Sequence, residues 1–96
     1  MERTNIFQSI KNAIWNAADN EEISLPEYTY EPTSGTETYI VEGFDDAIGI
    51  LALINDCMNQ YWNPDQDGEV RVDTFFSVGR YIIQVSEWEE IWEDEL

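Results

Sequence analysis

The chain has 96 residues, with 21 Asp and Glu against four Lys and Arg and no His, so its formal net charge is −17. Solubility of a small domain needs a net charge of only about 2–8 in magnitude. A field this negative repels nucleic acids and anionic membranes and attracts basic surfaces. We therefore expect neither direct nucleic-acid binding nor membrane binding, and the expected partner is a basic nucleic-acid-binding protein or nuclease.

The composition also argues for a folded chain. Hydrophobic residues make up 43% and aromatic residues 14%, which is more apolar material than a disordered acidic chain carries. The length fits one domain, covering residues 1–96. Its core is small and mutual repulsion of the carboxylates weakens it, so a homodimer stays open as a source of added stability.

Cysteine content and hydropathy indicate the compartment. Cys57 is the single cysteine, so an intramolecular disulfide is excluded and a cytoplasmic setting is expected. The first seven residues lack the basic start and apolar run of a signal peptide. The longest apolar stretch, residues 47–54, is far too short to span a bilayer.

The first half of the chain predicts a helix followed by a hairpin. Apolar residues recur at helical spacing over residues 5–18, and Thr4 or Asn5 is the predicted N-cap. Residues 27–42 predict two β-strands, because aromatic and β-branched residues flank a Pro-Thr-Ser-Gly turn at positions 32–35.

The second half predicts a helix, a second hairpin and a terminal helix. The strongest apolar periodicity runs from residue 45 to 62, with Asp45 or Asp46 as the predicted cap and Cys57 on the apolar stripe. Strands are predicted around a turn at residues 77–79, and a helix over residues 87–96. The expected fold is therefore α+β, in the order α-β-β-α-β-β-α, with helices on a small antiparallel sheet of about four strands.

The acidic C-terminal segment is the first candidate for partner binding. On a helix, its carboxylates would stand one turn apart, with Cβ atoms about 5–6 Å from one another, and DNA presents a phosphate on each strand about every 3.4 Å. Acids from the hairpins would extend such an array. The alternative is a solvated helix with Trp88 and Trp92 docked on the sheet. The candidate residues are Glu87, Glu89, Glu90, Glu93, Asp94 and Glu95, joined by Glu37, Glu42, Asp65, Asp67 and Glu69.

The segment from Asn63 to Thr74 partly fits a calcium-binding loop. Oxygen ligands stand at positions 1, 3 and 5 and Gly68 at position 6, but Thr74 occupies the position of the bidentate Glu. Proline, aspartate and glycine in this order also make an ordinary turn. We therefore predict no metal site and no cofactor.

Catalysis has little support in the sequence. There is no His to act as a base near neutral pH, and the chain holds neither a glycine-rich phosphate loop nor a nucleophile motif. We expect a protein that is not an enzyme. Two tryptophans outside the predicted core stripes, Trp15 and Trp62, would suit contact with arginine-rich surfaces if they are exposed.

The small size, the acidity, the many aromatic residues and the closing Glu93-Asp94-Glu95 run resemble those of small phage-encoded inhibitors of bacterial defence. Many anti-restriction and anti-CRISPR proteins of that kind are DNA mimics. The resemblance implies an inhibitor that blocks the DNA site of a CRISPR or restriction nuclease in the cytoplasm of a bacterial host cell. Two alternatives stay open: an acidic immunity protein against a basic nuclease toxin, and a small acidic secretion chaperone.

Overall fold

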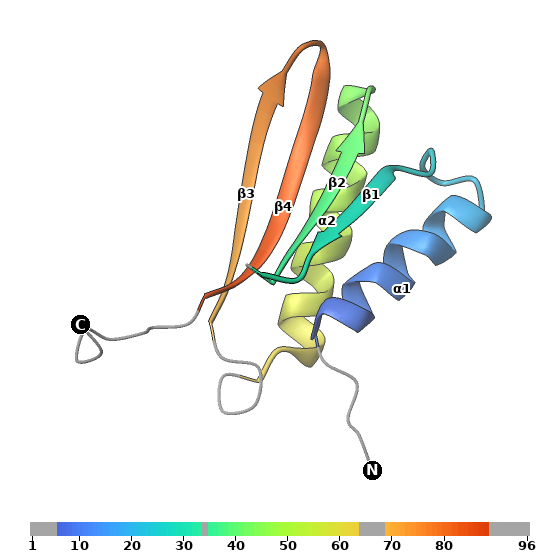
Figure 1. Ribbon diagram of the computed structural model, residues 1–96. Coiled ribbons are helices and arrows are strands. Elements are labelled where there is room, and N and C mark those ends of the chain that lie inside the picture. The colour runs from blue at the N-terminus through green and yellow to red at the C-terminus, as the bar shows by residue number, and fades with distance from the viewer. Residues whose placement is uncertain (1–5, 34, 64–68, 89–96) are drawn as a thin grey trace.

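The computed structural model describes residues 6–33, 35–63 and 69–88. Within these ranges the elements are α1 (Ile6–Asp19), β1 (Glu27–Glu31), β2 (Thr36–Val41), α2 (Phe44–Tyr61), β3 (Glu69–Ser77) and β4 (Arg80–Trp88). The four strands form one antiparallel sheet in the order β1-β2-β4-β3. Both helices lie on the same face of this sheet (Figure 1). The predicted α+β class and the sheet of two antiparallel hairpins are confirmed.

The predicted start of the terminal helix is wrong. β4 continues through Trp88, and its last residues pair with the beginning of β3, Glu87 with Val70 and Trp88 with Glu69. The ladder extends this far because β3 already begins at Glu69 and offers backbone partners to β4. Residues 89–96, which hold the rest of the predicted helix, lie outside the described residues.

The core forms where the two helical stripes meet the central strands. α1 buries Ile6, Ile10, Ile14 and Ala17, and α2 buries Ala47, Ile50, Ile54 and Cys57. β2 and β4 complete the core with Tyr39, Val41, Ile83 and Val85. The predicted stripes are therefore confirmed, including Cys57, whose thiol donates a hydrogen bond to the Ser9 carbonyl at 3.6 Å and links the two helices.

The start of α2 differs from the prediction. Gly43 is the N-cap and offers no side chain, so neither Asp45 nor Asp46 is the cap. Both aspartates lie in the first turn, where a negative charge interacts favourably with the helix dipole. Asp46 Oδ1 also accepts a hydrogen bond from the Ser24 backbone N–H at 3.1 Å, which fixes the α1–β1 loop against α2. The predicted caps of α1, Thr4 and Asn5, lie outside the described residues.

Trp15, which lies outside the predicted apolar stripe of its helix, is half-buried between α1 and the sheet. Its ring meets those of Tyr28 at 5.7 Å and Tyr39 at 6.3 Å, both edge to face. The β1–β2 hairpin lies beneath the flank of α1, so the covered arc of the helix is wider than its aliphatic stripe. Trp15 thus packs against the core and is not an exposed ring of the kind that the sequence analysis considered for partner contact.

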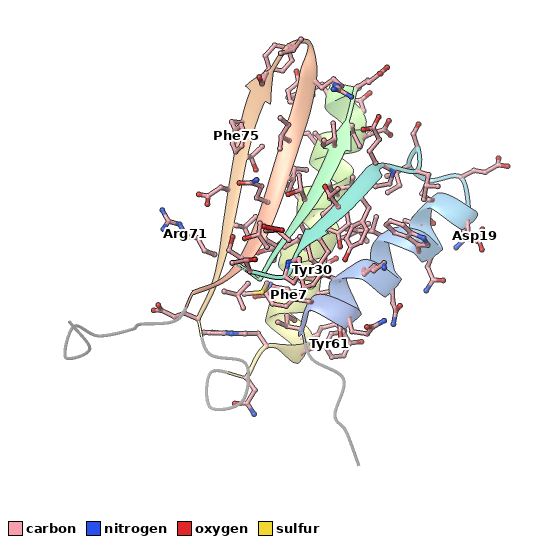
Figure 2. All side chains as sticks on the ribbon, in the orientation of Figure 1. Phe7, Asp19, Tyr30, Tyr61, Arg71 and Phe75 are labelled. Carbon is pink, nitrogen blue, oxygen red and sulfur yellow. The ribbon has the colours of Figure 1, made fainter. Side chains whose placement is uncertain are left out.

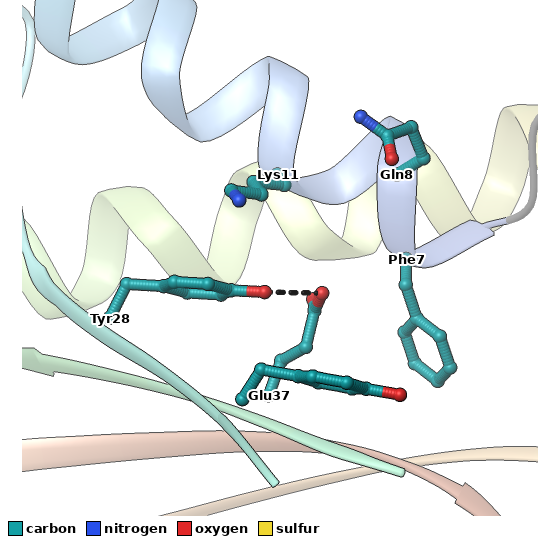
Figure 3. A pocket seen from close by; sticks show the side chains of 6 residues that line it. Phe7, Gln8, Lys11, Tyr28 and Glu37 are labelled. Atoms are coloured by element: carbon teal, nitrogen blue, oxygen red, sulfur yellow. Dashed lines mark hydrogen bonds between the residues drawn. The ribbon is translucent and has the colours of Figure 1, made fainter. Parts of the chain in front are cut away.

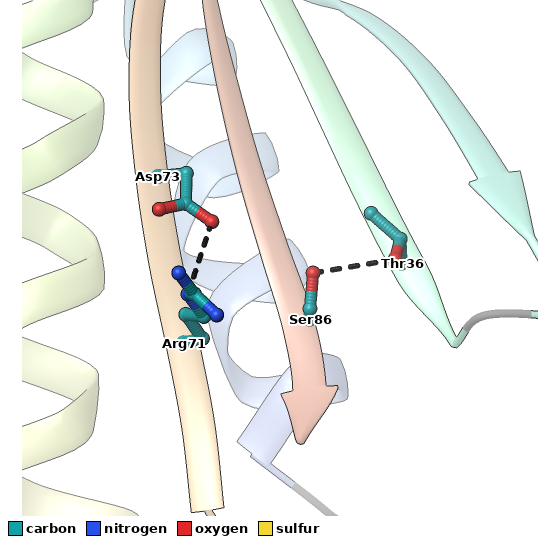
Figure 4. Close-up of polar contacts among 4 residues, drawn as sticks. All are labelled: Thr36, Arg71, Asp73 and Ser86. Atoms are coloured by element: carbon teal, nitrogen blue, oxygen red, sulfur yellow. Dashed lines mark hydrogen bonds and ion pairs between the residues drawn. The ribbon is translucent and has the colours of Figure 1, made fainter. Parts of the chain in front are cut away.

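The opposite face of the sheet carries no helix in the described part of the chain (Figure 1). Its side chains include a cross-strand apolar row of Ile40, Ile82 and Phe75. Polar pairs lie beside this row: the hydroxyls of Thr36 and Ser86 are 3.2 Å apart, and Arg71 Nε lies 3.5 Å from Asp73 Oδ2 (Figure 4). This alternation is typical of an antiparallel sheet with one face buried and the other open to solvent.

Candidate partner-binding surface

Glu37 is not part of a partner-binding surface, contrary to the sequence-based prediction. It lies on the helix-facing side of β2 and only 6% of it is exposed. Its carboxylate accepts hydrogen bonds from the Tyr28 hydroxyl at 2.8 Å and the Tyr39 hydroxyl at 3.1 Å (Figure 3 shows the first). Buried carboxylates need such donors to offset their desolvation. Glu37 is therefore the common acceptor of an interior polar cluster that consists of Glu37, Tyr28 and Tyr39.

A cavity of about 230 Å³ adjoins this cluster. It is lined by Phe7, Gln8, Lys11, Tyr28, Tyr30 and Glu37 (Figure 3). Lys11 Nζ lies 4.3 Å from the centre of the Tyr28 ring. This is a cation–π contact, in which the ring attracts the ammonium charge. The Glu37 carboxylate, the tyrosine hydroxyls and the Lys11 ammonium thus all contact other groups of the protein. Their contribution to the stability of the fold is sufficient to explain why they stand at this cavity.

The two tyrosines of this cluster should resist ionisation in alkali. Burial and the adjacent Glu37 carboxylate raise the pKa of both Tyr28 and Tyr39 well above the ordinary value, which is about 10. Above that pH the unfolded chain releases protons that the folded chain retains. Stability is thus fully present below about pH 10 and falls as the pH rises further.

An ultraviolet titration of phenolate absorbance checks this prediction. We expect two of the five tyrosines to remain protonated at about pH 11, where a free tyrosine is mostly ionised, and to ionise together with unfolding. In the Glu37→Gln variant both should ionise at lower pH, because the neighbouring negative charge is gone. Ionisation of all five tyrosines in the folded wild type would contradict the prediction.

The remaining sequence-predicted acids do not form one array within the described residues. Glu42 follows β2 at one end of the sheet, whereas Glu69 begins β3 and Glu87 lies near the end of β4, at the other end. Tyr81, which pairs with Val41, and Glu87 stand six positions apart along β4, and this corresponds to about 20 Å. The other candidates, Asp65, Asp67, Glu89, Glu90, Glu93, Asp94 and Glu95, lie outside the described residues.

The fold instead gathers acids around Glu42. A second cavity of about 230 Å³ lies between the α1–β1 loop and the β2–α2 junction, and Glu27, Glu42 and Asp46 line it. The hydrogen bond from Ser24 to Asp46 holds the loop, with its other acids, against this junction. We call this group the acidic end: Glu21, Glu22, Glu27, Glu42, Asp45 and Asp46.

Few cations neutralise the acidic end. Arg80 Nη1 lies 3.3 Å from Glu27 Oε2, an exposed ion pair that ties the β3–β4 turn to β1. Arg71 contacts Asp73 and Lys11 contacts Tyr28, both away from the acidic end. Among the residues that the structure describes, one paired arginine stands against six carboxylates, and this imbalance gives the acidic end a negative local field.

At the acidic end, some acidic residues occupy positions where they lower the local stability of the chain. Glu21 takes the left-handed conformation, with φ of 63°, where the chain leaves α1. Backbone bonds from Glu21 to Ala18 and from Glu22 to Ala17 form the usual helix-ending motif, in which glycine is preferred at this position. The last turn of α1 contains Asp19 and no basic residue (Figure 2), although the negative end of the helix dipole disfavours acids there. Residues that oppose local stability in this way are characteristic of functional surfaces.

The sequence missed this grouping because it joins three separate segments. Glu27 belongs to β1, Glu42 directly follows β2, and Asp46 belongs to α2. Only the pairing of Glu27 with Ile40 and the loop contact to α2 bring them to one place. A weak signal existed in the clustering of acids immediately before and after predicted elements.

Comparison with known proteins leaves the function open. No family model matches this chain, and neither the curated proteins nor the solved structures give a significant match. No helix in the described part of the chain has the length and apolarity needed to cross a membrane. Among the same residues, no group of three or more metal-ligating side chains is placed to hold a metal ion. The suggested calcium loop includes residues 64–68, which lie outside the described residues.

Proposed function

We propose that this protein is an inhibitor that binds a cationic nucleic-acid-binding protein or nuclease complex, of the CRISPR or restriction type. It blocks the DNA site by DNA mimicry, in the cytoplasm of a bacterial host cell. The observation that carries the proposal is the acidic end, where Glu27, Glu42 and Asp46 from three segments line one cavity and Arg80 pairs with Glu27. A nucleic-acid site that holds phosphates with Lys and Arg attracts such a surface for the same electrostatic reason.

Rigidity supports mimicry at this end. Glu27 lies in a β-ladder, Asp46 lies in the first turn of α2, and the intervening loop is fixed by the Ser24–Asp46 hydrogen bond. Ile23 packs against α2 at Gly49, where a Cβ would approach the Ile23 Cγ2 atom to 2.9 Å. Carboxylates held in place lose little conformational freedom on binding, so more of the electrostatic attraction appears as affinity.

Two triple variants with the same net charge test the proposal. The first neutralises the acidic end by Glu22→Gln, Glu42→Gln and Asp45→Asn. The matched control neutralises acids elsewhere by Glu31→Gln, Asp56→Asn and Asp73→Asn. Both lose three negative charges, so long-range attraction falls equally, and a difference between them reports local contact.

Each protein is immobilised and exposed to a bacterial host lysate, and bound proteins are eluted first with duplex DNA and then with high salt. We expect wild type and control to capture a nucleic-acid-binding protein that DNA displaces. The acidic-end variant should retain at most about a tenth of it, since loss of a few charged contacts costs more than 1.4 kcal/mol. Equal capture by both variants, or a captured partner that neither DNA nor salt displaces, would refute the proposal.

One observation favours the secretion-chaperone alternative. A groove of about 400 Å³ between the end of α2 and the start of β3 is lined by Met58, Trp62 and Val70, with Glu69 and Arg71 at its edges. An apolar groove of this kind can hold an extended segment of a client protein. Such a complex would resist salt, whereas the mimic complex weakens as salt screens its attraction. The salt elution therefore separates the two functions.

A further inference from the structure

The acidic end borders an exposed aromatic surface. Phe44 in the first turn of α2 is 59% exposed and Phe76 near the end of β3 is 62% exposed. The half-buried Tyr81 joins them, with ring centroids 5.8 Å from Phe44 and 4.8 Å from Phe76. Two further exposed apolar residues stand near these rings in the chain: Ile48, one turn along α2 from Phe44, and Val78, in the turn after β3. We call it the aromatic patch: Phe44, Ile48, Phe76, Val78 and Tyr81.

Packing within the chain does not account for the patch. Val78 is 91% exposed and has φ of 52°, next to Gly79 with φ of 75°. Positive φ at both central residues defines a type I′ turn, in which Asn or Gly is preferred at the position of Val78. A β-branched residue is strained there. The sequence thus keeps an exposed apolar side chain at the tip of the hairpin despite a conformational cost.

The patch and the acidic end share one edge of the molecule. Asp45 follows Phe44 directly in α2, and Glu42 follows Val41, whose strand partner is Tyr81. The ion pair between Arg80 and Glu27 joins the same hairpin to the acidic end. The rings of the patch and the carboxylates of Glu42 and Asp45, for which the described residues show no cation, therefore come from neighbouring positions at the same edge.

We propose that the aromatic patch is the docking site for arginine side chains of the cationic partner, an inference that rests on the proposed function. Arginine is the side chain whose chemistry matches both parts of this surface. Its planar guanidinium stacks on an aromatic face and donates two parallel hydrogen bonds to a carboxylate. A lysine ammonium offers a compact, strongly hydrated charge and fits the combination less well. The negative charges of Glu42 and Asp45 thus favour a basic partner. The rings of Phe44 and Phe76 favour its arginine side chains over its lysine side chains.

The test compares an oligo-arginine peptide with an oligo-lysine peptide of equal length, bound to the full chain and measured by isothermal titration calorimetry. Wild type should bind the arginine peptide about two- to fivefold more tightly for each ring engaged. The Phe44→Leu and Phe76→Leu variants should lose this preference, while binding of the lysine peptide is unchanged. Phe76→Tyr, which keeps a ring, should restore it.

Phe75→Leu is the matched control. Phe75 neighbours Phe76 but lies on the opposite face of β3, in the open row with Ile40 and Ile82 (Figure 2). We expect it to retain the arginine preference. The substituted rings at positions 44 and 76 are exposed, so circular dichroism should show folded variants, and Phe76→Tyr provides a second readout if a leucine variant unfolds.

The outcomes separate this inference from the proposed function. Salt-sensitive binding of both peptides with equal affinity would overturn the arginine site and leave the electrostatic function standing. Failure of both peptides to bind even at low salt would overturn both. Loss of the preference in Phe75→Leu as well as Phe76→Leu would also reject the patch, because the effect would then not depend on the face of the strand.

Discussion

Replacing Tyr39 with alanine is expected to lower the free energy of unfolding by about 3–5 kcal/mol, the usual cost of truncating a large buried aromatic residue. Tyr39 is fully buried and its ring contacts those of Trp15 and Tyr28. Its hydroxyl also donates to Glu37. Alanine would leave a cavity at the centre of the sheet and remove one of the two donors to a buried carboxylate.

The Tyr39→Phe variant separates these two effects. It keeps the ring and should cost about 1–3 kcal/mol, because a buried acceptor then loses a donor. Tyr28→Phe should cost less, since Tyr28 is only half-buried and water can replace its hydroxyl. Urea denaturation followed by tryptophan fluorescence measures all three variants. Equal stability of Tyr39→Phe and wild type would show that Glu37 does not depend on this donor.

Replacing Ile50 with alanine is expected to cost about 2–5 kcal/mol. Ile50 is 0% exposed and lies where α2 meets both α1 and the central strands. Its matched control is Ile48, two residues away on the same helix and about half exposed. Ile48→Ala should cost under about 1 kcal/mol, as surface substitutions usually do.

The pair also separates stability from binding. Ile48 belongs to the aromatic patch, so Ile48→Ala should weaken the binding of an arginine-rich partner and hardly change the urea concentration at the midpoint of unfolding. Ile50→Ala should lower the urea midpoint and leave the binding of that partner unchanged, provided that binding is measured under conditions in which the variant is folded. Similar midpoints for the two variants would mean that α2 is not packed as the structure describes.

Local periodicity predicted the elements well. The isoleucines of α1 and the stripe of α2 follow helical spacing, and the two hairpins carry turn residues at their centres. These signals depend only on neighbours in the sequence. The extension of β4 to Trp88 was missed because it depends on strand pairing with Glu69, a distant partner.

Side-chain environments were harder to predict than elements. Glu37 was predicted to lie on the binding surface and Trp15 to lie outside the apolar stripe of its helix, yet both contact the same pair of tyrosines. The acidic end depends on the pairing of two strands and one loop contact. Tertiary contacts of this kind produce no periodic pattern in the sequence. From a single sequence, the excess of acidic residues can be seen, but not which of them come together.

Within the part of the chain that the structure describes, the sheet has two unpaired borders, β1 and β3, and one uncovered face that includes Ile40, Ile82 and Phe75. Features of this kind invite edge-to-edge aggregation. A net charge of −17 opposes it, since two copies repel at every distance at which their strands could pair. We therefore expect the acidity on which the proposed function rests also to keep the free protein dispersed. A basic partner that neutralised this charge would remove the protection against aggregation, but its own surface would then cover the chain.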